Sequence, residues 1–355
     1  MPVQNIDINL FLKFSSEVPL FDVRSPSEYK HAHIPGAYSL PIFTDEERKE
    51  IGTQYKQISR EVAIKTGLRY FGKNLESFVL QVEQIINTKD KPAASKILLH
   101  CWRGGMRSSA MAWLLSQYGY DVYVLDGGYK QYRRYVLRQF EWPFHFQVLG
   151  GHTGSGKTEV LQELHKSGHP VIDLENLAQH KGSAFGALGM AEQPSQEQFE
   201  NLLERALAPY YAIDNSHGMI QPLPIWIENE SQRIGHVNLP NTFFRTLQES
   251  PCYLLTIPFD QRLEFITQQY GTFEKEKLVN AIMRIQKRLG GQHAKEAIFQ
   301  LLENNITECF RILLSYYDKE YNRAREKNNR TCIPFESHEI NAVKNASRLI
   351  QHPTH

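Results

Sequence analysis

The sequence predicts an α/β protein with parallel sheets, divided into an N-terminal domain at residues 1–140 and a second domain at 141–355. Three observations support this prediction. Short apolar runs alternate with helical patterns in both domains. Two of these runs end in glycine-containing loops that lead directly into a helix. The chain of 355 residues is also long enough for two domains of ordinary size.

In the first domain, strands are expected at residues 20–23, 97–99 and 122–125, and a helix at 108–118. Because strands and helices alternate, the sheet is expected to be parallel. Functional groups in parallel sheets lie at the carboxyl ends of strands. Cys101 follows one of these strands closely, so it is the first candidate for a functional residue.

Cys101 begins a strand-to-helix loop that favours negative charge. Gly104 and Gly105 permit a tight turn. The amide groups at the following helix N-terminus favour an anion, and Arg107 adds a positive charge. Both effects lower the pKa of a cysteine, so Cys101 is expected to be a thiolate, with Arg103 and Arg107 as its catalytic partners. The alternative is a buried structural cysteine, which would need neither the glycines nor the arginines.

This domain resembles the rhodanese-like family. The signature is carried by Asp22-Val23-Arg24, by Glu28-Tyr29 and by the run from His33 to Ala37. The strand, the Cys101 loop and the helix resemble the active loop of that family. The resemblance implies a rhodanese-like fold over about residues 1–140 and a cysteine that carries sulfur or selenium.

The Cys101 loop departs from the common sulfur-transferring pattern. Cys101 to Arg107 reads C-x5-R and is followed by serine. This pattern also resembles the HCx5R loop of cysteine phosphatases, some of which share the rhodanese fold. A longer loop makes room for a tetrahedral oxyanion. Two interpretations therefore stay open: a phosphatase, and a carrier that takes selenium or sulfur from a tetrahedral selenophosphate or thiophosphate.

The second domain opens with a P-loop. A strand is expected at residues 146–149 and a helix at 159–164, with G-x4-GKT between them. The resemblance to P-loop NTPases implies backbone N–H groups that wrap phosphate oxygens, a lysine that adds charge and a threonine that binds Mg²⁺. The residues expected to bind a phosphate or diphosphate are Gly151, Gly154, Ser155, Gly156, Lys157 and Thr158, with Thr158 as the magnesium ligand.

An acidic partner for the magnesium ion is expected at a later strand end. The expected strand at residues 171–172 is followed by Asp173 and Glu175, and the one at 225–227 by Glu228 and Glu230. The three apolar residues before Glu228 favour it over the others. Any of these carboxylates could instead be a capping or surface group. The glycine-containing run after Asp173 is expected to form a loop over the phosphate site. Its candidate substrate contacts are His180, Lys181 and Ser183.

From about residue 258 the chain is expected to be helical to its end, with two amphipathic helices around Gly290-Gly291. Two basic clusters are candidate tRNA contacts, although solvated helix faces would give the same pattern. They consist of Arg133 and Arg134, and of Arg284, Lys287 and Arg288.

Composition excludes several classes. A net charge of +1 predicts no general attraction to nucleic acid, so a polyanion would be bound by local patches. The four cysteines form no CxxC pair, which argues against a zinc site and a disulfide framework. We expect no bound metal of that kind, no prosthetic group, no membrane span and no signal peptide. A cytoplasmic location is therefore expected.

The order of the motifs resembles the bacterial tRNA 2-selenouridine synthase family over nearly the whole chain. The matching segments are HCWRGGMRS, GGHTGSGKT, DLENLAQHKGS and QPSQEQFE. The resemblance implies a transferase that acts on the wobble uridine, position 34, in the anticodon loop of tRNA. It implies conversion of 2-thiouridine to 2-selenouridine with selenophosphate, through S-geranyl-2-thiouridine made from geranyl diphosphate. The enzyme that makes selenophosphate is a further implied partner.

Two other classes are kept as alternatives. One is a rhodanese-fold cysteine phosphatase fused to a nucleotide-binding domain, which the C-x5-R loop allows. The other is a nucleotide-dependent regulatory module with an inert rhodanese domain, against which the intact Cys101 argues.

Overall fold

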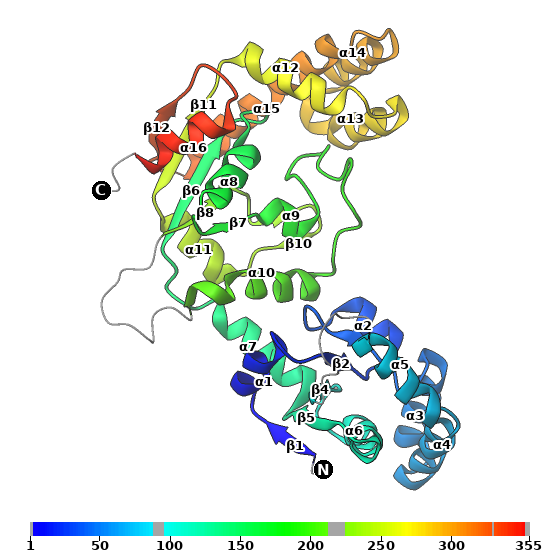
Figure 1. Ribbon diagram of the computed structural model, residues 1–355. Coiled ribbons are helices and arrows are strands. Elements are labelled where there is room, and N and C mark those ends of the chain that lie inside the picture. Colours follow the sequence, from blue (N-terminus) through cyan, green and yellow to red (C-terminus); the bar gives the residue numbers. More distant parts are fainter. Residues whose placement is uncertain (1–2, 88–95, 212–223, 329, 352–355) are drawn as a thin grey trace. The chain divides into compact units, whose positions relative to one another are not determined.

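The computed structural model describes residues 3–87, 96–211, 224–328 and 330–351 (Figure 1). The chain divides into two compact units. The first comprises Met1–Gln139 with Glu200–Glu204, and the second comprises Phe140–Phe199 with Arg205–His355. Each unit is built on one five-stranded parallel sheet, which confirms the predicted fold class.

The sheet of the first unit has the strand order β1-β5-β4-β2-β3. Its central strand β4 buries four consecutive residues, the pattern expected of a parallel strand covered on both faces. The strands are β1 (Gln4–Ile6), β2 (Leu20–Asp22), β3 (Tyr38–Ser39), β4 (Lys96–His100) and β5 (Asp121–Leu125). The predicted strands of this domain are therefore confirmed to within one residue at each end.

Seven helices accompany this sheet in the described residues of the first unit. They are α1 (Ile8–Ser15), α2 (Pro26–His31), α3 (Asp45–Gln57), α4 (Arg60–Lys73), α5 (Leu75–Asn87), α6 (Met106–Tyr118) and α7 (Gly128–Gln139). Helix α1 packs against α7, and α5 packs against α6. Helices α3 and α4 form a hairpin, because Thr44 and Ser59 cap their N-termini and only two residues join them.

The sheet of the second unit has the order β12-β11-β6-β8-β7, so the strand before the P-loop lies at its centre. The strands are β6 (Phe146–Gly151), β7 (Val171–Ile172), β8 (Ile225–Glu228), β11 (Cys252–Thr256) and β12 (Ile333–Glu336). A short antiparallel pair is formed by β9 (Arg233–Ile234) and β10 (Val237–Asn238). The carboxyl ends of β6 and β8 lie side by side, since Leu149 pairs with Glu228.

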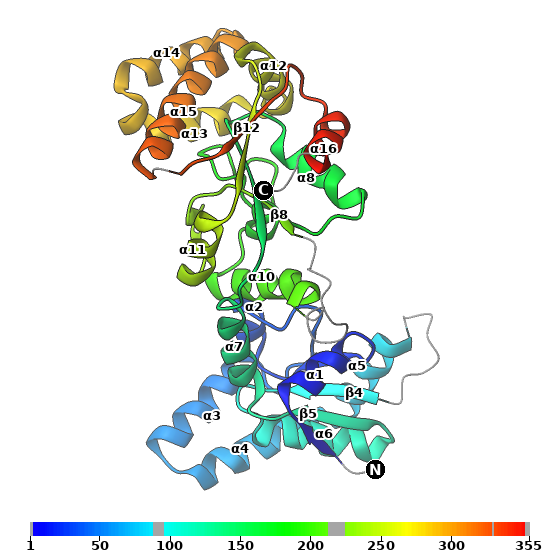
Figure 2. The same cartoon turned by 90° about the vertical axis from the view of Figure 1, so that its left-hand side faces the viewer.

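The helices of the second unit include a helical region after β11. They are α8 (Lys157–Lys166), α9 (Leu174–Ala178), α10 (Gln196–Tyr211), α11 (Asn241–Glu249), α12 (Phe259–Tyr270), α13 (Lys275–Leu289), α14 (Gly291–Leu302), α15 (Ile306–Asn328) and α16 (Ala342–Ile350). The two amphipathic helices predicted around Gly290-Gly291 are α13 and α14. Figure 2 shows α16 beside α8, and the two helices pack together.

The expectation that the chain is helical from residue 258 to its end is wrong at one place. Strand β12 follows α15 and joins the sheet beside β11. Pro334 lacks a backbone N–H, but β12 is an edge strand and tolerates this loss. Phe335 is buried in the same core cluster as Tyr253 and Leu255. Burial of this side chain stabilises β12 against the sheet.

None of the helices in the described residues combines the length and apolar character that a membrane-spanning segment needs.

Candidate functional site

The Cys101 loop joins β4 to α6 and is held in place by a second turn. Cys101 is buried, and the loop turns at Gly104, which has a φ of +66°. Gly128, in the turn after β5, lies so close that a Cβ atom there would be 2.5 Å from the Cys101 carbonyl oxygen. Only glycine fits this contact. The double-glycine turn after β5 therefore packs directly on the cysteine loop.

The surroundings of the Cys101 sulfur favour its thiolate. Its Sγ lies 3.2 Å from Ser108 Oγ. Burial raises the pKa of Cys101, but the Ser108 hydrogen bond and the Arg107 charge lower it. Backbone N–H groups of Arg103 and Ser108 lower it further, so the net pKa lies below that of an ordinary cysteine. Such a thiol is more nucleophilic at neutral pH than an unperturbed one.

Arg107 is fixed by a carboxylate that the sequence analysis did not single out. Glu28, on α2, accepts a hydrogen bond of 2.8 Å from Arg107 Nη1, and Arg48 Nε lies 3.7 Å from the same oxygen. Burial raises the pKa of Glu28, but these two arginines and the Ser25 amide lower it overall. Arg103 is exposed. Two guanidinium groups are therefore held beside the loop by one ionised carboxylate.

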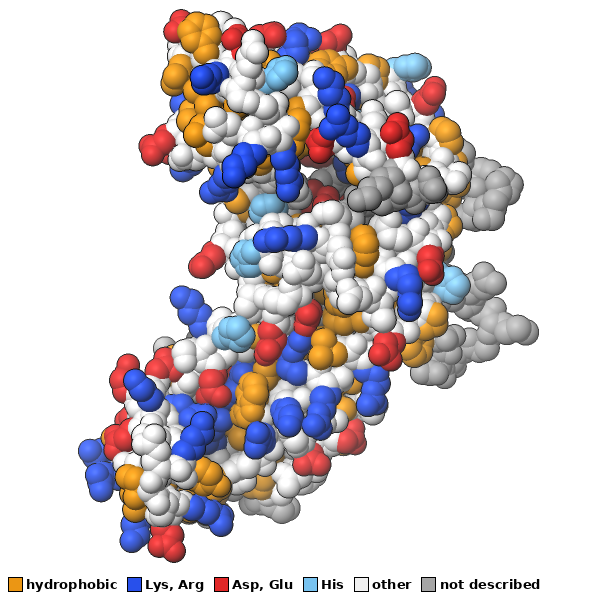
Figure 3. Space-filling view, turned by 180° about the vertical axis from the view of Figure 1, so that it is seen from behind, with side chains coloured by type: hydrophobic (Ala, Val, Ile, Leu, Met, Phe, Trp, Pro, Cys, Tyr) orange, Lys and Arg blue, Asp and Glu red, His pale blue; other side chains and the backbone are white. Residues whose placement is uncertain are grey.

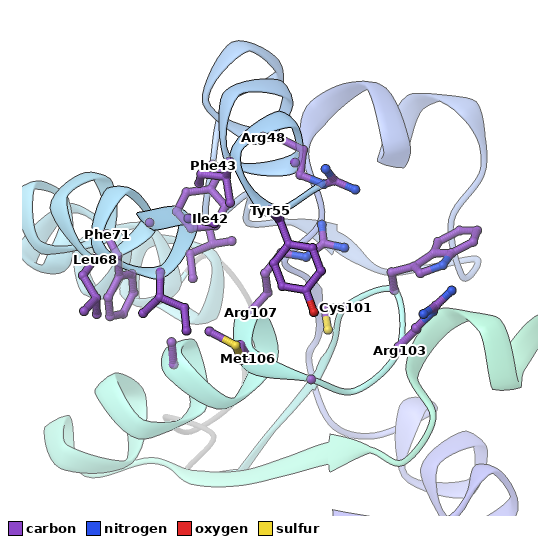
Figure 4. A pocket seen from close by; sticks show the side chains of 18 of the residues that line it. Ile42, Phe43, Arg48, Tyr55, Leu68, Phe71, Cys101, Arg103, Met106 and Arg107 are labelled. Atoms are coloured by element: carbon purple, nitrogen blue, oxygen red, sulfur yellow. The ribbon is translucent and has the colours of Figure 1, made fainter. Parts of the chain in front are cut away.

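An apolar cavity of about 540 Å³ opens beside Cys101 (Figure 4). Its walls come from the α3–α4 hairpin, from the segment after β3 and from the start of α6. Figure 4 shows Leu68 and Phe71 on one side of Cys101 and Arg103 on the other. The main apolar side chains in the lining are Ile42, Phe43, Ile51, Leu68, Phe71 and Met106.

The P-loop of the second unit lines a separate cavity of about 610 Å³. Gly154 and Gly156 both have a φ of +76°, and a Cβ atom on Gly154 would lie 2.7 Å from Ile266. Lys157 Nζ donates to the carbonyl oxygens of Gly151 at 2.9 Å and His152 at 3.4 Å. Ser155 Oγ is buried and has no hydrogen-bond partner within the described residues. The loop has the geometry of a phosphate cradle.

The carboxylate that contacts Thr158 is Glu175. Thr158 Oγ1 donates to Glu175 Oε2 at 3.3 Å, while Glu228 Oε1 accepts from the backbone N–H of Glu175 at 2.7 Å. The sequence favoured Glu228, but this side chain contacts the backbone of Glu175 and not Thr158. Asp173 caps α9, where its Oδ1 accepts from the Asn176 N–H at 2.8 Å. Burial is the largest cause of raised pKa values at Asp173, Glu175 and Glu228.

These oxygen atoms fit a magnesium ion that also binds phosphate oxygens. Mg²⁺ takes hydroxyl, carboxylate and phosphate oxygens and keeps several waters, so Thr158 and Glu175 suffice as protein ligands. A positive ion would also offset the cost of the buried carboxyl groups. Within the described ranges, no group of three or more His, Cys, Asp or Glu side chains is arranged to hold a metal ion by itself.

Two family models match the chain. The rhodanese-like domain matches residues 11–135, which confirms the resemblance of the first domain. The tRNA 2-selenouridine synthase AAA domain matches residues 144–349, more than half of the chain. This chain belongs to the tRNA 2-selenouridine synthase family.

Members of this synthase family match along most of the chain. The tRNA 2-selenouridine synthase of Bdellovibrio bacteriovorus is 33% identical, over 90% of this chain and 92% of its own. That of Hydrogenovibrio crunogenus is 35% identical, over 87% and 90%. Among solved structures, an N-terminal domain from Clostridium difficile 630 is 39% identical over 38% of this chain and 99% of its own, with a TM-score of 0.34.

In this family member, two of the three candidate residues in the loop after Asp173 lie at the P-loop cavity. Lys181 and Ser183 line the P-loop cavity, and Lys181 Nζ lies 5.6 Å from the centre of the Tyr270 ring. His180 does not line it. Burial is the largest cause that lowers the pKa of His180, so its imidazole is held neutral.

The basic residues predicted to contact tRNA differ in their surroundings. Arg133 pairs with Glu200 and donates to Asn201, and its side chain is largely buried. Arg134 is exposed on the same helix, α7. Figure 3 shows Lys and Arg side chains gathered on one face of the first unit. In the second unit, all three predicted cations of α13 are exposed: Arg284, Lys287 and Arg288.

Glu28 and Ser108 are contacts of the cysteine site that the sequence analysis missed. Both carried a signal: Glu28 belongs to the rhodanese-like signature, and Ser108 follows the C-x5-R loop directly. The α3–α4 lining was also missed. On α4, Ile64, Leu68 and Phe71 recur at helical spacing, which marks one apolar face.

Proposed function

We propose that this chain converts 2-thiouridine to 2-selenouridine at wobble position 34 of tRNA. Selenophosphate is the selenium donor, and S-geranyl-2-thiouridine, made from geranyl diphosphate, is the intermediate. The proposal rests on one observation. This chain is related to named tRNA 2-selenouridine synthases over most of its length, and it has a cysteine with a lowered pKa in its rhodanese-type loop.

The geranyl transfer is assigned to the P-loop. The sulfur of 2-thiouridine attacks the allylic carbon of geranyl diphosphate, so a C–S bond forms and a C–O bond breaks. The N3 proton of the base leaves, and pyrophosphate departs. Lys157 and the loop N–H groups stabilise the charge on the departing diphosphate. Magnesium, held by Thr158 and Glu175, would supply further neutralisation of that charge.

The selenium transfer is assigned to the Cys101 loop. Alkylation turns the sulfur into a group that can be displaced. Selenium then bonds to C2 of the base, the C2–S bond breaks and geranylthiol leaves. Water takes the phosphate of selenophosphate, so selenophosphate and water are the two co-reactants. Arg107 and the loop N–H groups hold the phosphate end of the donor. The Cys101 thiolate attacks the phosphorus of selenophosphate, so an S–P bond forms, the P–Se bond breaks and the released selenide attacks C2. Water then hydrolyses the S–P bond and frees phosphate.

The phosphatase alternative has less support. A cysteine phosphatase needs a general acid beside its loop. Glu28 is the carboxyl group in contact with Arg107, and its pKa is lowered, so it stays ionised at neutral pH. A carboxylate in this state cannot donate a proton to a leaving group.

Nucleoside mass spectrometry tests the proposal. A bacterial strain that lacks the gene for this chain should contain no 2-selenouridine in its tRNA. Returning the gene should restore the nucleoside, and it should do so only when the cell makes selenophosphate. In the proposed function, the protein acts in the cytoplasm, with tRNA as its substrate and the selenophosphate-producing enzyme as a partner. Unchanged 2-selenouridine in the deleted strain would contradict the proposal.

A further inference from the structure

The apolar cavity beside Cys101 is larger than the chemistry of that residue requires. In the proposed function, the Cys101–Arg107 loop and its N–H groups hold only the selenophosphate donor. The volume of about 540 Å³ lies in the range of pockets that bind small organic molecules, about 300–1,000 Å³. The part of the cavity beyond the Cys101 loop is therefore large enough for a second group besides the donor.

Large apolar side chains are left exposed at this cavity. Tyr55 is 58% exposed, Leu68 61% and Met106 56%. All three line the cavity, and they come from α3, α4 and the start of α6. Exposed apolar side chains that gather around a concave surface mark a binding site, whereas single exposed ones do not.

The positive charges of the lining include three arginines around Cys101. Arg48, Arg103 and Arg107 belong to the part of the lining that holds Cys101, and the side with Leu68 and Phe71 is apolar (Figure 4). An occupant that matches this distribution has an apolar tail and a polar or anionic end next to the thiol. A free anion would leave the apolar wall empty, and a plain hydrocarbon would make no use of the positive charge of the arginines.

We propose that this cavity binds the isoprenyl chain of the S-geranyl-2-thiouridine intermediate while selenium replaces sulfur. The inference rests on the proposed function, because that function supplies the geranyl group. The ten-carbon chain has no polar atom and lies against α3 and α4. The base then presents C2 to the selenium released at the Cys101 loop, and the RNA phosphates lie near the three arginines. The cavity is thus a positioning site for the leaving group.

The test uses anticodon stem–loop RNAs that carry either S-geranyl- or S-methyl-2-thiouridine at position 34. Binding to the full chain is followed by its tryptophan fluorescence, to which Trp102 in the cavity lining contributes. The wild-type chain should bind the S-geranyl RNA at least about tenfold more tightly than the S-methyl RNA, since only the longer chain reaches the apolar wall. Leu68→Gln combined with Tyr55→Gln should reduce this preference about tenfold.

Leu80→Gln is the matched control. Leu80 is 56% exposed on α5 of the same unit and does not line the cavity, so this variant should keep the wild-type preference. Both altered positions in the test variant are exposed, and its binding of S-methyl RNA reports that it is folded. Equal binding of the two RNAs by the wild-type chain would overturn the inference, as would an unchanged preference in the double variant.

Selenation of the same RNAs separates the inference from the proposed function. If the wild-type chain converts S-geranyl and S-methyl RNA with selenophosphate at equal kcat/KM, the proposed function stands and the cavity proposal fails. If neither RNA is converted, the proposed function fails. The binding preference and its loss in the double variant still decide whether the cavity takes an isoprenyl chain.

Discussion

The Sγ atom of Cys101 lies 3.2 Å from the Oγ atom of Ser108, across the turn that joins β4 to α6. Ser108 Oγ also lies 3.0 Å from the Gly105 carbonyl oxygen. A hydroxyl has one hydrogen, so Ser108 can donate to only one of these acceptors at a time. When Cys101 is a thiol, its S–H can donate to Ser108. When it is a thiolate, Ser108 can turn and donate to the sulfur.

Replacement of Ser108 should therefore raise the pKa of Cys101. In Ser108→Ala, burial still disfavours the thiolate, while one of the groups that stabilise it is gone. The thiolate should then form only at higher pH. The rate of Cys101 alkylation by iodoacetamide, measured against pH, should shift its midpoint upward. Ser109→Ala is the control, because Ser109 is exposed and donates to the same Gly105 oxygen at 3.2 Å. An identical midpoint in Ser108→Ala would show that the hydroxyl does not stabilise the thiolate.

The buried pair of Asp22 and Arg24 should be needed for stability. Arg24 Nη2 lies 2.6 Å from Asp22 Oδ2, and both side chains are almost fully buried. His100 cannot replace either charge, because burial lowers its pKa to about 4. Asp22→Asn should lower the free energy of unfolding by about 3–5 kcal/mol, since it leaves Arg24 buried without a counter-charge.

Urea unfolding measures this effect. Asp126→Asn, at an exposed position, should change the free energy by less than about 0.5 kcal/mol. The double variant Asp22→Leu with Arg24→Met should recover much of the loss, because neither charge is then left unpaired. If Asp22→Asn proved as stable as Asp126→Asn, the pair would have no such role.

Two adjacent arginines on α7 should differ in tRNA binding. Arg134 is exposed, and Arg133 already pairs with Glu200. Arg134→Ala should weaken tRNA binding and reduce the slope of log K against log salt by about 0.7–0.9, the effect of one lost phosphate contact. Arg133→Ala should change the slope much less. A filter-binding titration at several salt concentrations makes the comparison, and a wild-type slope in Arg134→Ala would contradict a phosphate contact at this position.

The parallel sheets and both loops could be predicted because the responsible patterns are local. The run at residues 97–99 is apolar throughout and leads through Cys101 to Gly104 and Gly105. The run at 146–149 is apolar except at Gln147 and leads directly into the glycines of the P-loop. The return of the chain in β12 could not be predicted in the same way. Ile333-Pro334-Phe335 is too short to show a period, and its pairing partner, β11, lies far away in the sequence.

The acidic partner of the P-loop illustrates a second limit. Glu175 and Glu228 both follow apolar strands, and the three apolar residues before Glu228 favoured it over Glu175. The structure distinguishes the two residues. Asp173 caps the N-terminus of the short helix α9, and Glu175 lies in that helix. This helix brings Glu175 to Thr158 and leaves Glu228 bonded to its backbone. Tertiary contacts among the segments of Thr158, Glu175 and Glu228 therefore determine which carboxylate lies at the P-loop.

The central claim is that two different sites carry the two steps. Purified variants are incubated with tRNA that contains either 2-thiouridine or S-geranyl-2-thiouridine, together with geranyl diphosphate and selenophosphate. Liquid chromatography of the nucleosides follows both products. Lys157→Ala should slow geranylation about 10²- to 10³-fold, because it removes charge stabilisation from the departing diphosphate.

Cys101→Ala gives the decisive result. It should convert 2-thiouridine to the S-geranyl form and accumulate that form without any 2-selenouridine. Lys157→Ala should produce neither nucleoside from 2-thiouridine, yet it should make 2-selenouridine from tRNA that is already geranylated. Failure of Cys101→Ala to geranylate would contradict the account, because the thiolate would then take part in both steps.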